Sequence, residues 1–149
     1  MRGLVQRVTS ASVVARDGEG WAQVGSIGRG LCVFVGVTHD DSVEQARKLA
    51  EKLWHLRVMD DEDGVMNRSV AVTTQTLLVV SQFTLYGDTS GGRRPSWIAA
   101  ARPEHAEPLV TVVVDHLRSL GATVETGRFR TEMQVSLVND GPVTLMLEV

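Results

Sequence analysis

Two segments near the end of the chain have the alternating pattern of β-strands, and the stretch between them limits how they can be connected. Apolar residues occupy every second position in 133–137 and again in 143–147, a period of two that is typical of strands with one buried face. Between them, Asp140-Gly141 favours a tight hairpin turn. The next residue, Pro142, fixes its own φ angle and has no N–H to donate to a neighbouring strand. The pattern therefore predicts two strands joined by a tight turn.

The bond between Gly141 and Pro142 leaves two interpretations of this turn open. X–Pro bonds are cis in roughly 5–6% of cases in folded proteins, and a cis bond here would turn both carbonyls to the same side and hold them rigidly. The alternative is a plain hairpin turn that the proline stiffens.

Length and composition fit one globular domain. The chain has 149 residues, of which 43% are hydrophobic and 22% charged, which is ordinary for a domain with its own core. The single cysteine, Cys32, lies in an apolar run, so a disulfide framework is excluded and a buried thiol is expected. No apolar run is long enough to span a bilayer, and the first residues lack the apolar core of a signal peptide. We therefore expect one domain over residues 1–149 in the reducing cytoplasm.

The charge of the chain argues against a broad nucleic-acid-binding face. A net charge of −3 gives no overall attraction to nucleic acid, although a small cationic patch is still able to hold an RNA end. The four histidines are scattered and no CxxC or HExxH spacing is present, so we expect no metal site. The acidic run Asp60–Asp63 lacks the ligand spacing of a calcium loop and is interpreted as a solvated turn.

The order of the expected elements favours an α+β domain with a largely antiparallel or mixed β-sheet. Ser42 and Gln45 form a capping box that opens a helix reaching Leu56, and a second main helix is predicted over Glu107–Leu120 with a proline in its first turn. Residues 59–76 are expected to be irregular. Strands are predicted at Leu4–Val14, Trp21–Ile27, Leu31–Val37, Thr76–Val80, 122–126 and 132–138.

Polar residues appear abruptly where the strand Thr76–Val80 ends, in Ser81-Gln82-Phe83-Thr84. Such positions often form sites, because a rigid element holds them while their polar groups stay accessible. A hydroxyl nucleophile would need an adjacent base held by a third group, and no histidine lies near this stretch in the sequence. What remains is main-chain chemistry, in which the N–H groups of Phe83 and Thr84 receive a developing oxyanion.

Two cationic features of the sequence each allow two interpretations. Arg7 lies among the polar positions of the first strand and by default faces solvent. The glycine-rich loop 89–97 carries Arg93 and Arg94, which suits a phosphate contact as well as a plain solvated loop.

Two of these stretches together resemble the signature motifs of a known family. Ser81-Gln82-Phe83-Thr84 and Gly141-Pro142-Val143-Thr144 are similar to the paired motifs of D-aminoacyl-tRNA deacylases. The resemblance runs essentially end to end, and the pair is much more specific than either tetrapeptide alone. Further matches, in order, are Val5-Gln6-Arg7-Val8, Gly36-Val37-Thr38, Met66-Asn67-Arg68-Ser69, Arg94-Pro95-Ser96 and Val138-Asn139-Asp140-Gly141.

The resemblance implies a cytosolic homodimer of barrel-like subunits that hydrolyses the ester joining a D-amino acid, or glycine, to the tRNA 3′ end. It implies a cis bond at the Gly–Pro pair, in a loop that enters the active site of the other subunit. It implies no metal, no organic cofactor and no membrane partner. The residues it assigns are Ser81, Gln82, Phe83 and Thr84 for catalysis, with Gly141, Pro142, Val143, Thr144 and a bracing Arg7 for substrate binding.

This picture agrees with the chemistry of the residues. Two rigid carbonyls are able to bind the substrate's α-amino group and fill the space that an L side chain would need. Water or the terminal ribose 2′-hydroxyl would then supply the proton chemistry. Two rival interpretations remain: a non-catalytic RNA- or metabolite-binding dimer, and an esterase or peptidase with a threonine nucleophile.

One departure from the family pattern lies before the last strand pair. The family usually carries a glycine and a small residue after the phenylalanine of this segment, whereas here Phe129 is followed by Arg130 and Thr131. Arg130 is expected either to line the entrance and touch a phosphate or to face solvent.

Overall fold

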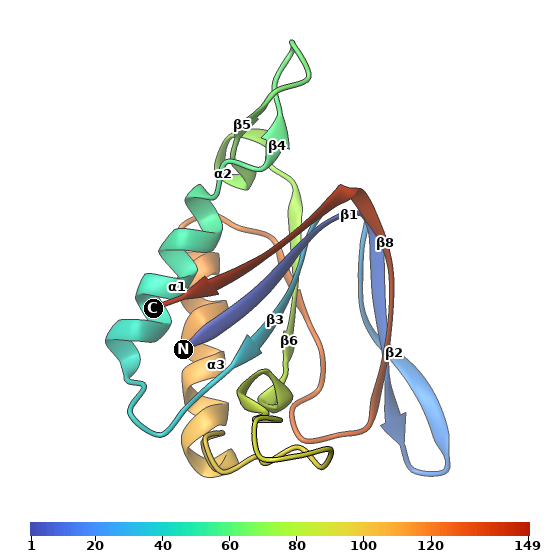
Figure 1. The fold of residues 1–149 in the computed structure, drawn as a ribbon. Helices are drawn as coiled ribbons and strands as arrows, with labels where there is room; N and C mark the ends of the chain where they lie inside the picture. The colour runs from blue at the N-terminus through green and yellow to red at the C-terminus, as the bar shows by residue number, and fades with distance from the viewer.

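A computed structural model describes residues 1–149 as one α+β domain, in which a strongly bent mixed sheet is nearly closed on itself (Figure 1). The helices are α1 (Val43–His55), α2 (Val70–Thr73), the 3₁₀ helix η1 (Phe83–Tyr86) and α3 (Pro103–Ser119). The strands are β1 (Arg2–Asp17), β2 (Gly20–Ile27), β3 (Gly30–Gly36), β4 (Met59–Asp60), β5 (Met66–Arg68), β6 (Thr76–Ser81), β7 (Val124–Thr126) and β8 (Met133–Glu148).

The long strand β1 organises the sheet. Its first half pairs antiparallel with β3 and its second half with β2, while β8 follows it along both halves. The order continues from β3 to β6 and β7 by parallel pairing. The sheet is therefore mixed, as predicted, and the bend of β1 and β8 makes it barrel-like.

Two apolar clusters stabilise this arrangement. The larger one fills the space between the sheet and the helices α1 and α3, which lie together on one side of it (Figure 1). The smaller one lies inside the bend and includes Cys32 and Leu78, whose side chains are fully buried. The predicted buried thiol is confirmed, since Cys32 is fully buried, and this burial raises its pKa to about 12. Strand β3 is covered on both faces, as its unbroken apolar run predicted.

The predicted hairpin at residues 139–144 is wrong. These residues lie within the single strand β8, which pairs with β1 on both sides of them. Gln6 pairs with Thr144 and Val8 with Asn139, so one residue of β1 faces the four residues 140–143. These four residues form a protruding segment, which we call the β8 bulge. A strand as long as β1 offers partners to both segments, so no chain reversal is needed between them.

The two main helices are confirmed, with one correction of a boundary. Ser42 and Gln45 form the predicted capping box of α1. Helix α3 begins at Pro103, four residues before the predicted start, and Pro108 lies inside it. Pro103 already occupies the first turn, where a missing N–H costs nothing. The predicted stop is confirmed at Gly121, which has a φ of 101°.

Residues 59–76, predicted to be irregular, contain the short hairpin of β4 and β5 and the single turn α2. Asp61 closes the hairpin, because its carboxylate accepts hydrogen bonds from the Val65 and Asp63 N–H groups and from the Asn67 amide. The Val65 hydrogen bond is the main cause of a lowered pKa at Asp61. This supports the interpretation of the acidic run as a solvated turn.

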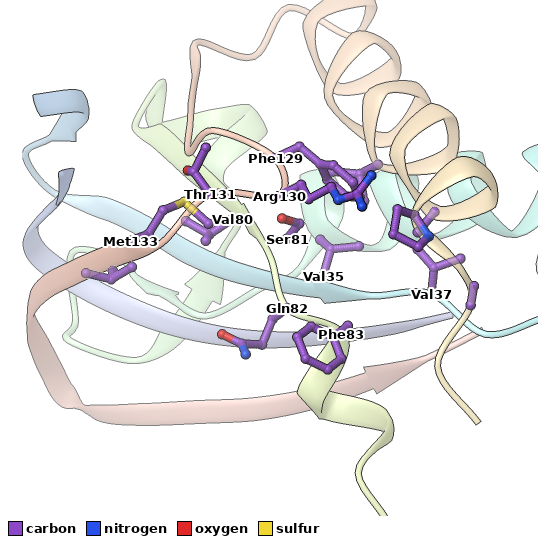
Figure 2. Close-up of a pocket in the computed structure, with 15 residues that line it drawn as sticks. Val35, Val37, Val80, Ser81, Gln82, Phe83, Phe129, Arg130, Thr131 and Met133 are labelled. Carbon is purple, nitrogen blue, oxygen red and sulfur yellow. The ribbon is translucent and has the colours of Figure 1, made fainter. Parts of the chain in front are cut away.

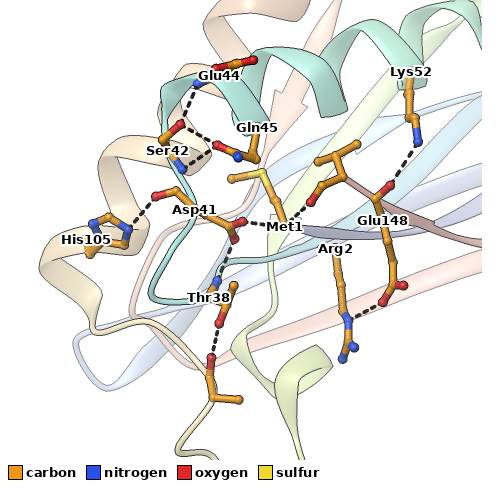
Figure 3. A network of polar contacts seen from close by, with 12 residues as sticks. Met1, Arg2, Thr38, Asp41, Ser42, Glu44, Gln45, Lys52, His105 and Glu148 are labelled. Carbon is orange, nitrogen blue, oxygen red and sulfur yellow. Dashed lines mark hydrogen bonds and ion pairs between the residues drawn. The ribbon is translucent and has the colours of Figure 1, made fainter.

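The amino group of Met1 lies buried in a polar network beside α1 (Figure 3). It donates to the Asp41 carboxylate at 2.5 Å and to the Val149 carbonyl at 2.9 Å. The second oxygen of Asp41 accepts the Thr38 N–H at 2.8 Å, and the His105 ring lies 2.9 Å from the Asp41 carbonyl. Asp41 therefore holds together the two ends of the chain, the β3–α1 loop and α3. No helix combines the length and apolar character needed to cross a membrane.

We expect Asp41→Ala to lower the free energy of unfolding by about 3 to 5 kcal/mol, because it leaves a buried ammonium group without its charged partner. Denaturant unfolding measures this. Glu148→Gln is the control, since Glu148 pairs with Arg2 in an exposed ion pair and its loss should cost less than about 1 kcal/mol. Equal losses for the two variants would contradict the special role of Asp41.

Candidate active site

A cavity of about 580 Å³ opens where β3, β6, α3 and the start of β8 meet (Figure 2). Ten of its fifteen lining residues are hydrophobic, so its walls suit the flat apolar face of a base or an aromatic ring. Polar groups come from Ser81 and Gln82 at the end of β6 and from Arg130 and Thr131 in the segment before β8. Such an apolar cleft with a few polar groups is the best candidate for a binding site in this chain.

The end of β6 positions the polar stretch that the sequence singled out. The Gln82 N–H donates to the Val35 carbonyl at 2.7 Å, which continues the pairing with β3 for one residue before η1 begins. Phe83 packs edge-on against Trp97, with ring centroids 5.5 Å apart. Ser81, Gln82 and Phe83 line the cavity, and Thr84 lies just beyond them.

The main-chain N–H groups of Phe83 and Thr84 have no acceptor within the chain. They belong to the first turn of η1, whose N–H groups have no intrahelical partner, and no side chain caps them. Two unpaired donors beside a cavity are able to bind a carbonyl oxygen or an oxyanion.

The side chains of this region do not form an activated nucleophile. The Thr84 hydroxyl accepts a hydrogen bond from the Gln82 amide, which is no base. Asp88 caps the following turn by accepting the Ser90 N–H at 2.8 Å, and this hydrogen bond lowers its pKa. The geometry therefore offers main-chain donors and no general base near Thr84.

The second signature stretch begins in the β8 bulge, which contains Gly141, Pro142 and Val143, and ends at Thr144, which pairs with Gln6. The Gly141–Pro142 bond is cis, and both residues are exposed. Gly141 has a φ of 119°, and a Cβ there would lie 2.8 Å from the Val143 side chain, so only glycine fits this position. Thr144 is also exposed, whereas Val143 packs partly against the larger core cluster.

Arg7 is buried beneath the bulge, with 9% of its surface exposed, so the expectation that it faces solvent by default is wrong. Its guanidinium donates to the Val58 carbonyl and to the Asp60 carboxylate, both at 2.8 Å. It also lies 3.4 Å from the Asp140 carbonyl and 3.5 Å from the Asp140 carboxylate. These charged partners compensate the burial of the guanidinium and connect the bulge to β4.

Asn139 provides a second anchor that the sequence analysis did not identify. Its side-chain amide donates to the Arg7 carbonyl at 2.9 Å and to the Val143 carbonyl at 3.0 Å, so it spans the base of the bulge. The Asn-Asp-Gly sequence was a usable signal, since asparagine often bonds to main chain in turns.

The two signature stretches lie at opposite ends of the sheet within one chain. Ser81 pairs with Val35, which in turn pairs with Gly3, whereas the bulge lies beside Arg7. Four residues along β1 correspond to roughly 13 Å. Figure 1 shows the same separation, with η1 at one end of the sheet and the bend of β8 at the other. One chain therefore does not bring these residues into a single site.

The cavity is also lined by apolar residues that no local pattern marks as part of a site. Arg130 and Thr131 do line it, but further wall residues come from ordinary apolar positions of α3, of β8 and of the segment before β8. Only tertiary packing brings them together, so local patterns could not identify them. They are Pro103, Ala106, Val110, Phe129, Met133 and Val135.

We expect Arg7→Gln to loosen the β8 bulge and to lower the free energy of unfolding by about 2 to 3 kcal/mol, because charged hydrogen bonds at a buried site are lost. Hydrogen exchange at the amides of residues 140–143 and denaturant unfolding measure the two effects. Arg29→Ala is a matched control, since Arg29 pairs with the same Asp140 carboxylate at 3.3 Å but is 67% exposed. If both variants leave exchange unchanged, Arg7 does not brace the bulge.

Comparison with known proteins agrees with the resemblance of the motifs. The family profile described as D-Tyr-tRNA(Tyr) deacylase matches residues 4–148. The D-aminoacyl-tRNA deacylase of Streptomyces coelicolor is 58% identical, with all of both chains covered. That of Halalkalibacterium halodurans is 51% identical, with 99% of both chains covered.

Solved structures have the same fold. The c-Myc DNA unwinding element binding protein matches with a TM-score of 0.91 and 37% identity, over 100% of this chain and 99% of that one. A probable eukaryotic D-amino acid tRNA deacylase matches with a TM-score of 0.83 and 16% identity, over 99% and 98%. With a family profile over nearly the whole length and relatives more than half identical, the chain belongs to the D-Tyr-tRNA(Tyr) deacylase family.

Proposed function

We propose that this protein hydrolyses the ester bond of D-aminoacyl-tRNA, and of glycyl-tRNA, releasing the free amino acid and the tRNA. The observation that carries the proposal is the pair of unpaired N–H groups at Phe83 and Thr84 beside a mostly apolar cavity. The names of the full-length relatives support the same activity. Because aminoacyl-tRNA is made and used in the cytoplasm, the proposal places the enzyme there.

Water attacks the ester carbonyl while the N–H groups of Phe83 and Thr84 donate to its oxygen. Negative charge develops on this oxygen in the tetrahedral intermediate, and donors about 2.7–3.1 Å away stabilise it. The intermediate collapses with loss of the ribose 3′-oxygen, which takes up a proton, and the amino acid leaves as a carboxylic acid. The terminal 2′-hydroxyl relays the proton from water to the leaving oxygen, so no side-chain base is needed. Ser81 and Gln82 line the cavity beside the reacting ester.

Selection of the D enantiomer depends on a second copy of the chain. In this proposal the Gly141–Pro142 carbonyls of one subunit enter the cavity of the other, bind the α-amino group and occupy the space of an L side chain. Glycine has no side chain to exclude and is accepted.

Four features support this shared site. The bulge is too far from the cavity of its own chain, Arg7 and Asn139 hold it from beneath, and its tip is exposed. Apolar side chains flank it on β8, where Val138, Leu145 and Met146 are 57%, 40% and 47% exposed. Exposed apolar groups of this kind favour an interface. A monomer in solution that still rejects L substrates would contradict the shared site.

The proposed activity predicts release of amino acid from D-Tyr-tRNA and none from L-Tyr-tRNA. Incubation of the purified protein with each substrate, followed by quantification of the remaining ester, measures this. Binding of both substrates without release would favour a non-catalytic nucleic-acid-binding protein. Release from both would favour an esterase that does not distinguish handedness.

We expect Thr84→Val to lower the turnover of D-Tyr-tRNA by less than about ten-fold, because only a neutral hydrogen bond from Gln82 is lost. Loss of a true nucleophile costs more than about ten-thousand-fold. Single-turnover kinetics separates the two cases. Thr123→Val is the control, since Thr123 is exposed and does not line the cavity. An acyl-enzyme trapped on Thr84 would contradict main-chain catalysis.

A further inference from the structure

Arg130 occupies the wall of the cavity that faces the proposed reaction site. Figure 2 shows it beside Phe129, across the cavity from Gln82 and Phe83. It is the only charged side chain among the fifteen lining residues. Its side chain is exposed and makes no hydrogen bond or ion pair within the chain. By contrast, Arg128 pairs with Asp17 at 3.7 Å.

The backbone at Arg130 adopts a conformation that suits glycine. Its φ is 57°, in the left-handed region that is unfavourable for an L residue with a side chain. No hydrogen bond or ion pair of the Arg130 side chain within the chain offsets this cost. A strained residue at the wall of a cavity points to a function outside the folding of the chain.

We propose that the Arg130 guanidinium binds the phosphate that joins the terminal adenosine of tRNA to the preceding nucleotide. This inference rests on the proposed function. The ester must lie at Phe83 and Thr84, and the apolar walls accommodate the terminal nucleoside. The polynucleotide then leaves through the mouth of the cavity, where the exposed Arg130 lies. A planar guanidinium binds phosphate oxygens by two parallel hydrogen bonds.

A second anion in the substrate has the same chemistry. The carboxylate side chain of D-Asp or D-Glu would also pair with a guanidinium. The phosphate is favoured, because every tRNA carries it at a fixed position relative to the ester, whereas the carboxylate is present on few substrates. Binding of the phosphate and binding of the carboxylate predict different results for substrates that lack one of these two anions.

The test compares Arg130→Gly with the wild-type protein on D-Tyr-tRNA, on D-Asp-tRNA and on D-tyrosine esterified to adenosine, which has no phosphate. We expect kcat/KM for D-Tyr-tRNA to fall by about ten-fold or more, with no change for the adenosine ester. The slope of log affinity for tRNA against log salt concentration should decrease in magnitude by about 0.7, the value for one phosphate on a single strand. Arg130→Lys should restore part of the loss.

Two controls exclude an effect on folding. Glycine suits the backbone at position 130, so Arg130→Gly should melt at the same or a higher temperature than the wild type. Arg128→Ala removes a nearby cation that does not line the cavity and should leave the activity on all three substrates unchanged.

Each other outcome overturns the inference in a distinct way. An equal loss on D-Tyr-tRNA and on the adenosine ester would assign Arg130 a role in the shape of the cavity wall. A loss confined to D-Asp-tRNA would assign it to the carboxylate, and no loss would exclude a role in binding. If the wild-type protein releases nothing from D-Tyr-tRNA, the proposed function itself fails.

Discussion

The pairing of β8 with β1 is the interaction on which the rest of the structure depends. It runs from Arg2 opposite Glu148 to Ala15 opposite Met133, so one pair of strands carries both the β8 bulge and a wall of the cavity. The start of β8 forms a wall of the cavity, and its middle carries the bulge. Because a paired strand has little freedom along its length, the spacing between the bulge and the cavity wall is fixed within each chain. In the proposed pair of chains, the same spacing would fix how far the bulge of one chain reaches into the cavity of the other.

The chemistry available at both regions belongs to the main chain. The Phe83 and Thr84 N–H groups are donors, and the carbonyls of the bulge are acceptors. The two groups whose pKa burial raises to about 12, Cys32 and Tyr86, stay neutral at neutral pH and supply no base. A site made of backbone groups needs no proton uptake or release to become active, but it does need the backbone to be held in place. The polar side chains around the bulge provide that support.

Periodicity in the sequence predicted most of the elements, because it reports which face of a strand or helix is buried. The capping box of α1, the covered strand β3 and the end of α3 at Gly121 all followed from local residues. The hairpin at 139–144 failed for the opposite reason. Whether a turn-like stretch reverses the chain depends on β1, more than a hundred residues away. The burial of Arg7 depends likewise on Val58 and Asp60, which no local pattern connects to it.

The β8 bulge is an exposed segment that other parts of the chain hold in one conformation. Four residues face one residue of β1, so the extra chain must leave the plane of the sheet, and an unsupported protrusion would sample many conformations. Here the supports lie underneath: the Arg7 guanidinium reaches the Asp140 carbonyl, and the Asn139 amide spans from β1 to Val143. Gly141 is needed for two reasons: its positive φ disfavours residues with a side chain, and a Cβ there would lie too close to the Val143 side chain. The shape of the exposed tip is therefore set by buried groups, and a rigid tip is what discrimination by steric exclusion requires, since a flexible one would yield to an L side chain.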